Sequence, residues 1–379
     1  MIYLEEFSAK QFRGIKDLKI TNLGNINILV GDNNSGKTSV LEAMMLLRNT
    51  SEFSNVLNVI RLRDNGVFSP FRISAYDNFL YMFNPEKDDK CIEVEGLVDG
   101  RLVGVSLYGT VENVLVDMAE LHDRNRKVHN SLGEQGAVYE ENEAPEFQGR
   151  LESRIGDKVV YEEKITFNPF TRLSGIKVSK PQNIEMVYVS PADHINGNVF
   201  SRIIKNDDYK EIVLHVIQVF DKDIENILYI KNEQTSRPIE CIKHKRLGIM
   251  PLSTYGDGIK KVLLLANSIA KAAGGILLVD EIETAIHSRH YDDIFKFVIK
   301  ACQQFDIQLF ATTHSIETVD SFLATQCDEE NDIYDHNNRD LIRVITFRKN
   351  VEKDKTDARV LSGKNVFNNR KNFEFEVRL

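Results

Sequence analysis

The sequence predicts an α/β fold, and three apolar runs that end in polar residues are the basis of that prediction. The runs are residues 26–30, 275–279 and 308–313, and each has the continuous apolar character of a strand buried on both faces of a sheet. Helix-like segments at 37–48 and 288–303 follow the first and second runs. Because ligands bind at the carboxyl ends of strands in open α/β sheets, the residues after each run are candidates for a functional site.

The loop after the first run reads GDNNSGKTS and has the spacing G-x-x-x-x-G-K-[ST] of a phosphate-binding loop, between a strand and a helix as that motif requires. Glycines let backbone N–H groups surround a phosphate at the positive end of the helix dipole. The ammonium of Lys37 would meet the β- and γ-phosphates, and the hydroxyl of Thr38 would bind Mg²⁺. The expected nucleotide-binding residues are Gly31, Asp32, Asn33, Asn34, Ser35, Gly36, Lys37, Thr38 and Ser39.

An acidic pair follows the second run, and a histidine follows the third. Asp280 is expected to hold Mg²⁺ together with Thr38, and Glu281 to polarise the attacking water. His314 is expected to reach the γ-phosphate. The alternatives are a strand that ends in solvated acids and a histidine that caps the next helix with Ser315. The phosphate loop upstream favours catalysis. The expected catalytic residues are Lys37, Glu281 and His314.

A second anion-binding helix start is expected before the acidic strand. Residues 251–258, PLSTYGDG, bring hydroxyl groups, glycines and an acid to the start of a helix over 257–273. Thr254 and Gly256 are the expected phosphate contacts. An ordinary N-capped helix is the alternative.

Composition narrows the functional class. Lys and Arg number 48 and Asp and Glu 57, and the net charge of −9 argues against a general polyanion binder. Four scattered cysteines without a C-x-x-C pair fit reduced thiols. The first residues do not have the pattern of a signal peptide, and the longest apolar runs are too short to span a bilayer. We therefore expect a cytoplasmic protein without a membrane partner.

The middle of the chain has a different character. Between about 70 and 190, alternating stretches separated by glycine-containing turns predict antiparallel sheet. Residues 139–146 are acidic and poor in large apolar side chains, which predicts a loop. Beyond this sheet, we expect a helix at 207–220 and strands at 224–231 and 239–245.

The order of these motifs resembles that of ABC-type ATPase heads, and within that superfamily the soluble RecF, SMC and OLD-type group. The segment FRGIKDL at 12–18 is similar to the start of OLD-like phage-defence ATPases. The segment DEIETAIH at 280–287 resembles their D-E-x-E-x-G-L-H sequence. The resemblance spans about 1–50 and 185–325.

This resemblance implies an ABC-type P-loop NTPase head with a mixed sheet, which binds ATP with Mg²⁺ and hydrolyses the ATP. It also implies a homo-oligomer built on a head-to-head dimer, in which Thr254 and Gly256 of one subunit close on the γ-phosphate held by the other. The expected parts are an N-terminal lobe with the P-loop (1–50), a mainly β insertion (51–184), the second part of the head (185–328) and a small C-terminal α/β appendage (329–379).

The chain departs from the ABC pattern in three places. The transporter signature L-S-G-G-Q appears only as STYGD at 253–257, so the hydroxyl that meets phosphate is open. His287 stands where ABC proteins often have aspartate. The lid glutamine that senses Mg²⁺ in ABC proteins has no clear counterpart in the sequence, and Gln182 is a candidate for it. An N-K-x-D motif is absent from the sequence, which argues against a GTPase.

A fused Toprim nuclease, common in OLD proteins, would need a D-x-D pair after the head. None follows His314, and the pair Asp221 and Asp223 is expected to form a helix-to-strand turn. We therefore expect ATP-dependent head dimerisation to gate a separately encoded effector such as a nuclease or toxin, in anti-phage defence. The alternatives are a RecF-like DNA-maintenance ATPase, for which DNA would be a partner, and a non-hydrolysing ATP-dependent scaffold. The basic stretch 243–246 is expected to be a solvated strand end rather than a nucleic-acid patch.

Overall fold

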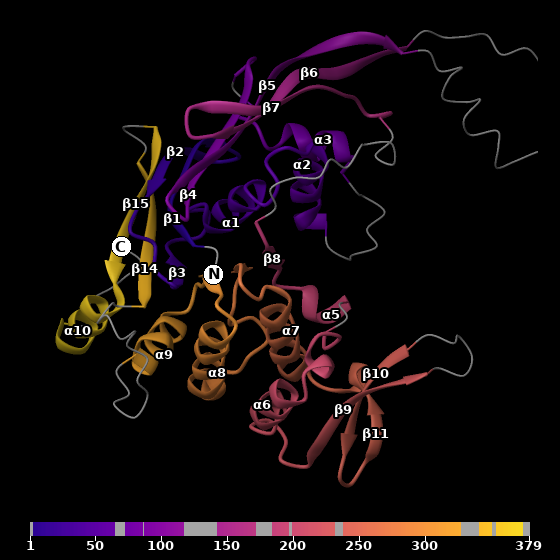
Figure 1. The fold of residues 1–379 in the computed structure, drawn as a ribbon, viewed down its shortest axis with the longest axis vertical. Coiled ribbons are helices and arrows are strands. Elements are labelled where there is room, and N and C mark those ends of the chain that lie inside the picture. The colour runs from indigo at the N-terminus through magenta and orange to yellow at the C-terminus, as the bar shows by residue number, and fades with distance from the viewer. Residues whose placement is uncertain are drawn as a thin grey trace, which may run out of the picture.

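A computed structural model describes most of the chain, and it confirms the expected α/β class (Figure 1). The described residues are 3–64, 73–85, 87–116, 142–171, 184–196, 199–231, 238–326, 341–350 and 354–373. Within these ranges the strands form two six-stranded sheets and one three-stranded sheet.

The central sheet has the order β15-β14-β3-β13-β12-β8. Its strands are β3 (Ile26–Val30), β8 (Met186–Val189), β12 (Ile276–Val279), β13 (Gln308–Thr312), β14 (Ile342–Asn350) and β15 (Lys355–Ser362). All neighbours in it are parallel except β14 and β15, so the sheet is mixed as predicted. Every residue of β3, β12 and β13 is buried, which confirms the interpretation of the three apolar runs.

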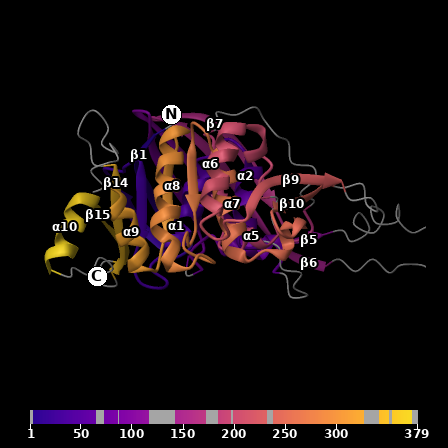
Figure 2. The same ribbon diagram turned by 90° about the horizontal axis from the view of Figure 1, so that it is seen from below.

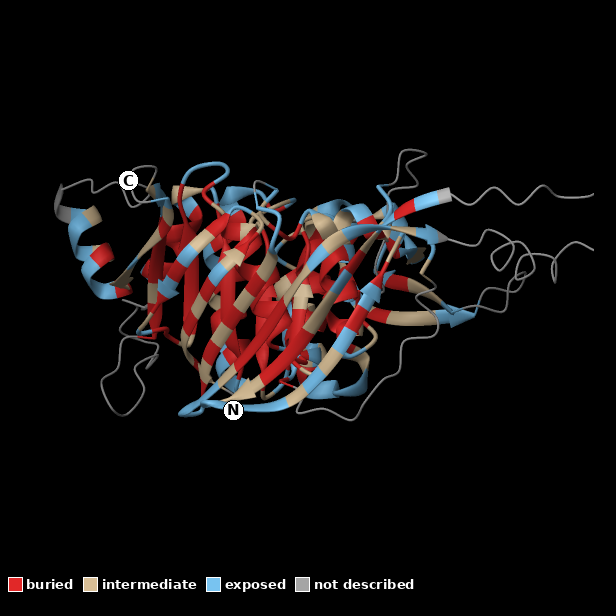
Figure 3. Ribbon diagram, turned by 90° about the horizontal axis from the view of Figure 1, so that it is seen from above, coloured by how far each residue is buried: buried red, intermediate tan, exposed pale blue. Residues whose placement is uncertain are grey.

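The second sheet is antiparallel and has the order β2-β1-β4-β5-β6-β7. Its strands are β1 (Leu4–Phe12), β2 (Ile15–Ile20), β4 (Lys90–Val98), β5 (Arg101–Val116), β6 (Asn142–Ile155) and β7 (Lys158–Phe167). Helix α1 (Lys37–Leu46) contacts strands of both sheets and carries side chains of the core between them. Figure 3 shows buried residues across the centre of the strands and more exposed ones toward their ends.

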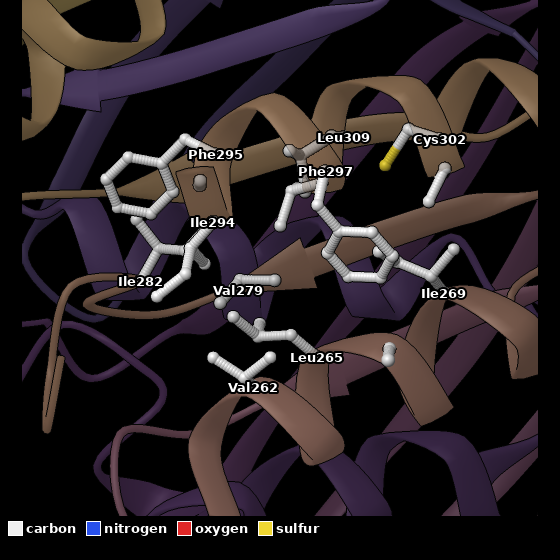
Figure 4. Close-up of a cluster of buried hydrophobic side chains, with 14 of the residues drawn as sticks. Val262, Leu265, Ile269, Val279, Ile282, Ile294, Phe295, Phe297, Cys302 and Leu309 are labelled. Carbon is white, nitrogen blue, oxygen red and sulfur yellow. The ribbon is translucent and has the colours of Figure 1, made fainter. Parts of the chain in front are cut away.

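Three helices cover the other face of the central sheet. They are α7 (Asp257–Lys271), α8 (Tyr291–Gln304) and α9 (Ile316–Gln326), and they lie side by side in Figures 1 and 2. Their apolar side chains form one core with the sheet: Val262 and Leu265 of α7 lie beside Val279 of β12 (Figure 4). The sequence of α7 has an amphipathic pattern, but residues 261–269 are all buried in the structure.

The third sheet has the order β11-β10-β9 and lies beside α6 and α7 (Figure 1). Its strands are β9 (Ile224–Lys231), β10 (Pro238–His244) and β11 (Gly248–Pro251), so both strands expected here are present. The remaining α-helices are α2 (Phe53–Ile60), α3 (Ala75–Leu80), α5 (Asp193–Asn196), α6 (Asp207–Ile217) and α10 (Gly363–Phe373). Short 3₁₀ turns are η1 (Arg61–Asp64), η3 (Ile203–Lys205), η4 (Leu252–Thr254) and η5 (Ser288–His290).

Two segments differ from the sequence-based picture. Strand β14 pairs in parallel with β3, so part of the expected C-terminal appendage is a central strand beside the P-loop strand. Residues 142–146 of the expected acidic loop begin β6 and pair with 112–116, because the alternation there places Ala144 inward. Residues 139–141 lie outside the described residues.

Among the described residues, no helix is both long enough and apolar enough to cross a membrane. Cys91, Cys241 and Cys302 are free thiols, and Cys327 lies outside the described residues.

Candidate nucleotide-binding site

The loop between β3 and α1 has a backbone that requires its glycines. Gly31 has a φ of +143°, and a Cβ there would lie 2.8 Å from the carbonyl oxygen of Phe347. Gly36, the residue before α1, has a φ of +99°, and Asn34 has a φ of +63°. Side chains at the two glycine positions would be strained, and the one at Gly31 would also collide. The sequence motif therefore adopts the bent loop that opens onto the start of a helix, where backbone N–H groups can bind phosphate.

Lys37 is buried at the first turn of α1, with its ammonium directed back at the loop. Its Nζ donates to the carbonyl oxygens of Gly31 at 2.8 Å and Asp32 at 2.9 Å. Burial lowers the pKa of Lys37, and the carboxylates of Asp280 and Asp32 oppose that shift. The carbonyl oxygens therefore hold the ammonium at the place where phosphate charge would be bound, and the nearby acids favour its charged form.

Thr38 and Asp280, the expected Mg²⁺ ligands, are in contact. The Oγ1 of Thr38 donates to the Oδ1 of Asp280 at 3.1 Å, although 242 positions separate them in the sequence. Asp280 is 4% exposed. A hydroxyl and a carboxylate side by side are oxygen ligands of the kind that Mg²⁺ prefers. The two residues therefore fit a magnesium ion bound next to the phosphate loop.

Thr312, the last residue of β13, organises both acids, and the sequence interpretation missed it. Its Oγ1 donates to the Oδ1 of Asp280 at 2.6 Å and accepts from the backbone N–H of Glu281 at 2.8 Å. A threonine at a strand end has ordinary β propensity, so its sequence position gave no signal of this role. The pairing of β12 with β13 places it there.

Glu281 follows β12 in a left-handed conformation, with a φ of +46°. Such a backbone is uncommon outside glycine and is found at functional sites where the surroundings hold it in place. Its Oε2 accepts from the hydroxyl of Thr284 at 3.2 Å, and its Oε1 lies 3.8 Å from Nε2 of His314. The backbone N–H of His314 donates to the Oε1 of Glu283 at 2.9 Å. The structure therefore brings together the two residues expected to act on water and the γ-phosphate.

A cavity of about 730 Å³ lies over the phosphate loop. Its lining includes eight expected residues, namely Asn34, Ser35, Gly36, Lys37, Thr38, Ser39, Asp280 and His314. It also includes residues that were not expected in the site, among them Arg13, Gly14, Arg63, Tyr188 and Lys349. Lys349 comes from β14, so the C-terminal part of the chain contributes to the wall of the cavity. This volume is within the range of small-molecule sites.

Two arginines of the cavity wall share one buried acid. Glu42 of α1 is fully buried, and its carboxylate lies 2.8 Å from Nε of Arg13 and 2.6 Å from Nε of Arg63. Arg63 also donates from Nη2 to the hydroxyl of Ser39 at 3.2 Å. The acid therefore fixes two cations next to the phosphate loop, where they add positive potential for an anionic ligand.

Thr254 and Gly256 are not among the residues that line this cavity. Both precede α7; Thr254 is exposed, and its hydroxyl donates to the carbonyl oxygen of Pro251 at 2.7 Å. Gly256 is the N-cap residue of α7, which lacks a side-chain cap. Within one chain, the expected signature is therefore separate from the phosphate loop.

The turn between α6 and β9 and the end of β10 bring together three potential metal ligands. Asp221, Asp223 and His244 have ligand atoms within 4.8 Å of one another. However, the Nδ1 of His244 accepts from the backbone N–H groups of Arg246 and Leu247, so its proton is on Nε2, which lies 3.2 Å from Asp221. A protonated nitrogen does not bind a metal. The hydrogen bonds of His244 therefore fix the turn formed by Arg246 and Leu247 and link it to Asp221.

The basic stretch beside this turn is neutralised by neighbouring acids. Lys243 pairs with Glu225 at 2.9 Å, and Arg246 pairs with Asp223 at 2.6 Å. This supports the solvated strand end expected from the sequence. Gln182, the candidate lid residue, lies outside the described residues.

A family model described as "AAA domain, putative AbiEii toxin, Type IV TA system" matches residues 124–320. The chain belongs to this family. A second model, described as an AAA ATPase domain, matches residues 2–103 and so includes the phosphate loop. These AAA ATPase matches confirm the expected ATP hydrolase and the expected class of P-loop ATPase head.

Individual proteins similar to this AAA chain include two sequence relatives and a solved structure. An ATP/GTP phosphatase of Helicobacter pylori is 22% identical over 338 residues, which cover 84% of this chain and 86% of that protein. The uncharacterized protein MJECL10 of Methanocaldococcus jannaschii is 46% identical over 59 residues, which are 15% of this chain and 27% of that protein. A solved SmcHead bound to the C-winged helix domain of ScpA has a TM-score of 0.48 and 13% identity, with 96% of this chain and 99% of that chain covered.

Proposed function

We propose that the AAA chain holds ATP and Mg²⁺ over residues 31–39 and that Glu281 polarises the water that attacks the γ-phosphate. The observation that supports this most directly is the Thr312 hydroxyl, which joins the Mg²⁺ ligand Asp280 to the backbone of Glu281. Lys37 would neutralise phosphate charge, and Thr38 with Asp280 would hold Mg²⁺, whose charge stabilises the phosphoryl group during transfer. His314, 3.8 Å from Glu281, would orient this carboxylate toward the phosphate.

Hydrolysis would take place in a head-to-head dimer. Thr254 and Gly256 precede an uncapped helix start and lie outside the cavity of their own chain, which supports a role toward the ATP of a second copy. The test is light scattering of Glu281→Gln at saturating ATP. A dimer or larger assembly that forms with ATP and not with ADP is the expected result. A variant that stays monomeric, while the wild-type monomer hydrolyses ATP, would contradict composite sites.

The output of this cycle would be control of a separately encoded effector, such as a nuclease or toxin, in anti-phage defence. The family description names a toxin of a type IV toxin–antitoxin system, which supports a place in such systems. Open sheet edges, such as that of β7, are places where a second chain could pair.

Phage plating on the native host tests this role. Wild-type protein should lower plaque counts, and both Lys37→Ala and Glu281→Gln should abolish that protection. Equal protection by the wild type and both variants would contradict ATP-dependent gating. The RecF-like alternative predicts instead a several-fold stimulation of the ATPase by duplex DNA. The scaffold alternative predicts ATP-dependent assembly without turnover.

A further inference from the structure

Lys261 is a lysine where the fold leaves no access to water. It lies in the second turn of α7, its exposed fraction is 0%, and the helix around it is packed into the core of the central sheet. Burying an ammonium is costly unless acids and acceptors compensate for the lost water. A lysine at this position therefore needs a partner that compensates for the lost hydration of its ammonium.

The partner is the backbone of the proposed catalytic acid. The Nζ of Lys261 donates to the carbonyl oxygen of Glu281 at 3.4 Å, and the same oxygen accepts from the N–H of Thr284 at 3.0 Å. Burial lowers the pKa of Lys261 to about 8, and the carboxylates of Glu283, Asp193, Asp280 and Glu281 oppose this shift. The four carboxylates that favour the ammonium all come from residues outside α7, and two of them, Asp280 and Glu281, belong to the hydrolytic site.

The turn that Lys261 contacts is held in an unusual conformation at both ends. Glu281 has a φ of +46° and Ala285 a φ of +69°, so two non-glycine residues of the segment 281–285 are in the left-handed region. Such residues persist only where neighbouring groups fix them. At the first end, the backbone N–H of Glu281 is held by Thr312 and its carbonyl by Lys261.

The first turn of the same helix approaches the second end. A Cβ at Gly258 would lie 3.2 Å from the carbonyl oxygen of Ala285 and 3.1 Å from Cε1 of Phe220. The start of α7 thus approaches the turn through a backbone position that has no side chain. Figure 4 shows Val262 and Leu265 of α7 beside Val279 and Ile282, which lie on either side of the acid pair. Helix and turn are therefore packed as one unit.

We infer that Lys261 is a positioning residue: it fixes the 281–285 turn, and with it the Glu281 carboxylate, to the start of helix α7. Lys261 lies one helical turn, about 6 Å, beyond Asp257, the first residue of α7. Any contact made at Thr254 or Gly256 would therefore reach the acid through one rigid turn of helix. This inference depends on the proposed role of Glu281 and does not require the dimer.

The test is Lys261→Met, which removes the ammonium and keeps an unbranched apolar chain in a buried site. We expect kcat for ATP to fall at least tenfold, while KM and the affinity for a fluorescent ATP analogue stay within twofold of wild type. Lys271→Met, at the exposed end of the same helix, is the matched control and should leave all three values unchanged. A merely structural role would lower the Tm and the affinity together with kcat. That outcome, or a kcat within twofold of wild type, would overturn the inference.

A double variant separates this idea from the role of Glu281 itself. In single-turnover assays, Glu281→Gln alone should lose nearly all activity; if it does not, the proposed role of Glu281 fails first. If Lys261 acts through Glu281, adding Lys261→Met to Glu281→Gln should cause no further loss, and a further tenfold loss would contradict the inference. Should Lys261→Met fail to fold, Gly258→Ala tests the other contact: kcat should fall without a lower Tm, and an unchanged kcat would count against the proposal.

Discussion

Replacing Thr312 with valine tests the arrangement of the hydrolytic site at a single atom. Valine keeps the shape and the β-branched character of the side chain and removes only the hydroxyl. That hydroxyl donates to Asp280 at 2.6 Å and accepts from the N–H of Glu281 at 2.8 Å, in a residue that is 1% exposed. The change therefore removes two hydrogen bonds and leaves the packing of β13 intact.

The expected cost follows from these two bonds. A hydrogen bond contributes about 1 kcal/mol net to stability, so unfolding free energy should fall by about 2 kcal/mol. The bond to Glu281 also fixes the acid that acts on water, and losing about 1.4 kcal/mol of transition-state stabilisation lowers kcat about tenfold. ATP affinity should change little, because Lys37 and the phosphate loop do not contact Thr312 in the hydrogen bonds of the described residues.

Urea unfolding and steady-state phosphate release measure the two effects. The matched control is Thr325→Val in α9, where the hydroxyl donates to the carbonyl oxygen of Ser321 at 3.0 Å. This control should cost about 1 kcal/mol and leave kcat unchanged. If Thr312→Val were as active as the control, the bridge between the acids would have no catalytic importance, and the reasoning would be refuted.

Three further changes probe the phosphate loop, the buried acid Glu42 and, away from the site, Glu240 of β10. Lys37→Ala should remove most ATP binding in calorimetry, because the charge facing the β- and γ-phosphates is lost; unchanged affinity would overturn the phosphate-loop assignment. Glu42→Gln should lower the free energy of unfolding in urea by about 3 kcal/mol. This is the low end of the range for breaking a buried ion pair, because the Arg63 side chain is 47% exposed. An unchanged free energy would mean that the ion pair between Glu42 and Arg63 is not formed. Burial raises the pKa of Glu240, so the contribution of this group to stability is present at low pH and is lost as the pH rises through the folded pKa. Glu240→Gln should therefore raise the Tm at pH 7 and not at pH 4. An equal Tm shift at both pH values would contradict this.

The central sheet and its functional edge could be predicted from the sequence because local patterns encode them. Continuous apolar runs predicted β3, β12 and β13, and the polar residues after them lie together at one edge of the sheet. The glycine spacing predicted a loop whose φ angles only glycine adopts readily.

Long-range pairing could not be predicted in the same way. Strand β14 pairs with β3 although more than 300 residues separate them, and the pattern of apolar and polar residues in β14 does not indicate which strand it pairs with. Thr312 looked like an ordinary strand residue. Lys261 did leave a signal: it lies four residues before Leu265 on the apolar stripe of α7, where a lysine is rare unless it has a partner.

The most direct test of the account is to measure phosphate release and ATP binding in parallel for Glu281→Gln. The amide keeps the shape of the side chain and cannot accept a proton from water. The account predicts ATP affinity within twofold of wild type and a turnover reduced at least a hundredfold. Turnover near the wild-type rate, with ATP still bound, would place the hydrolytic base elsewhere and contradict the site built from Asp280, Glu281 and Thr312.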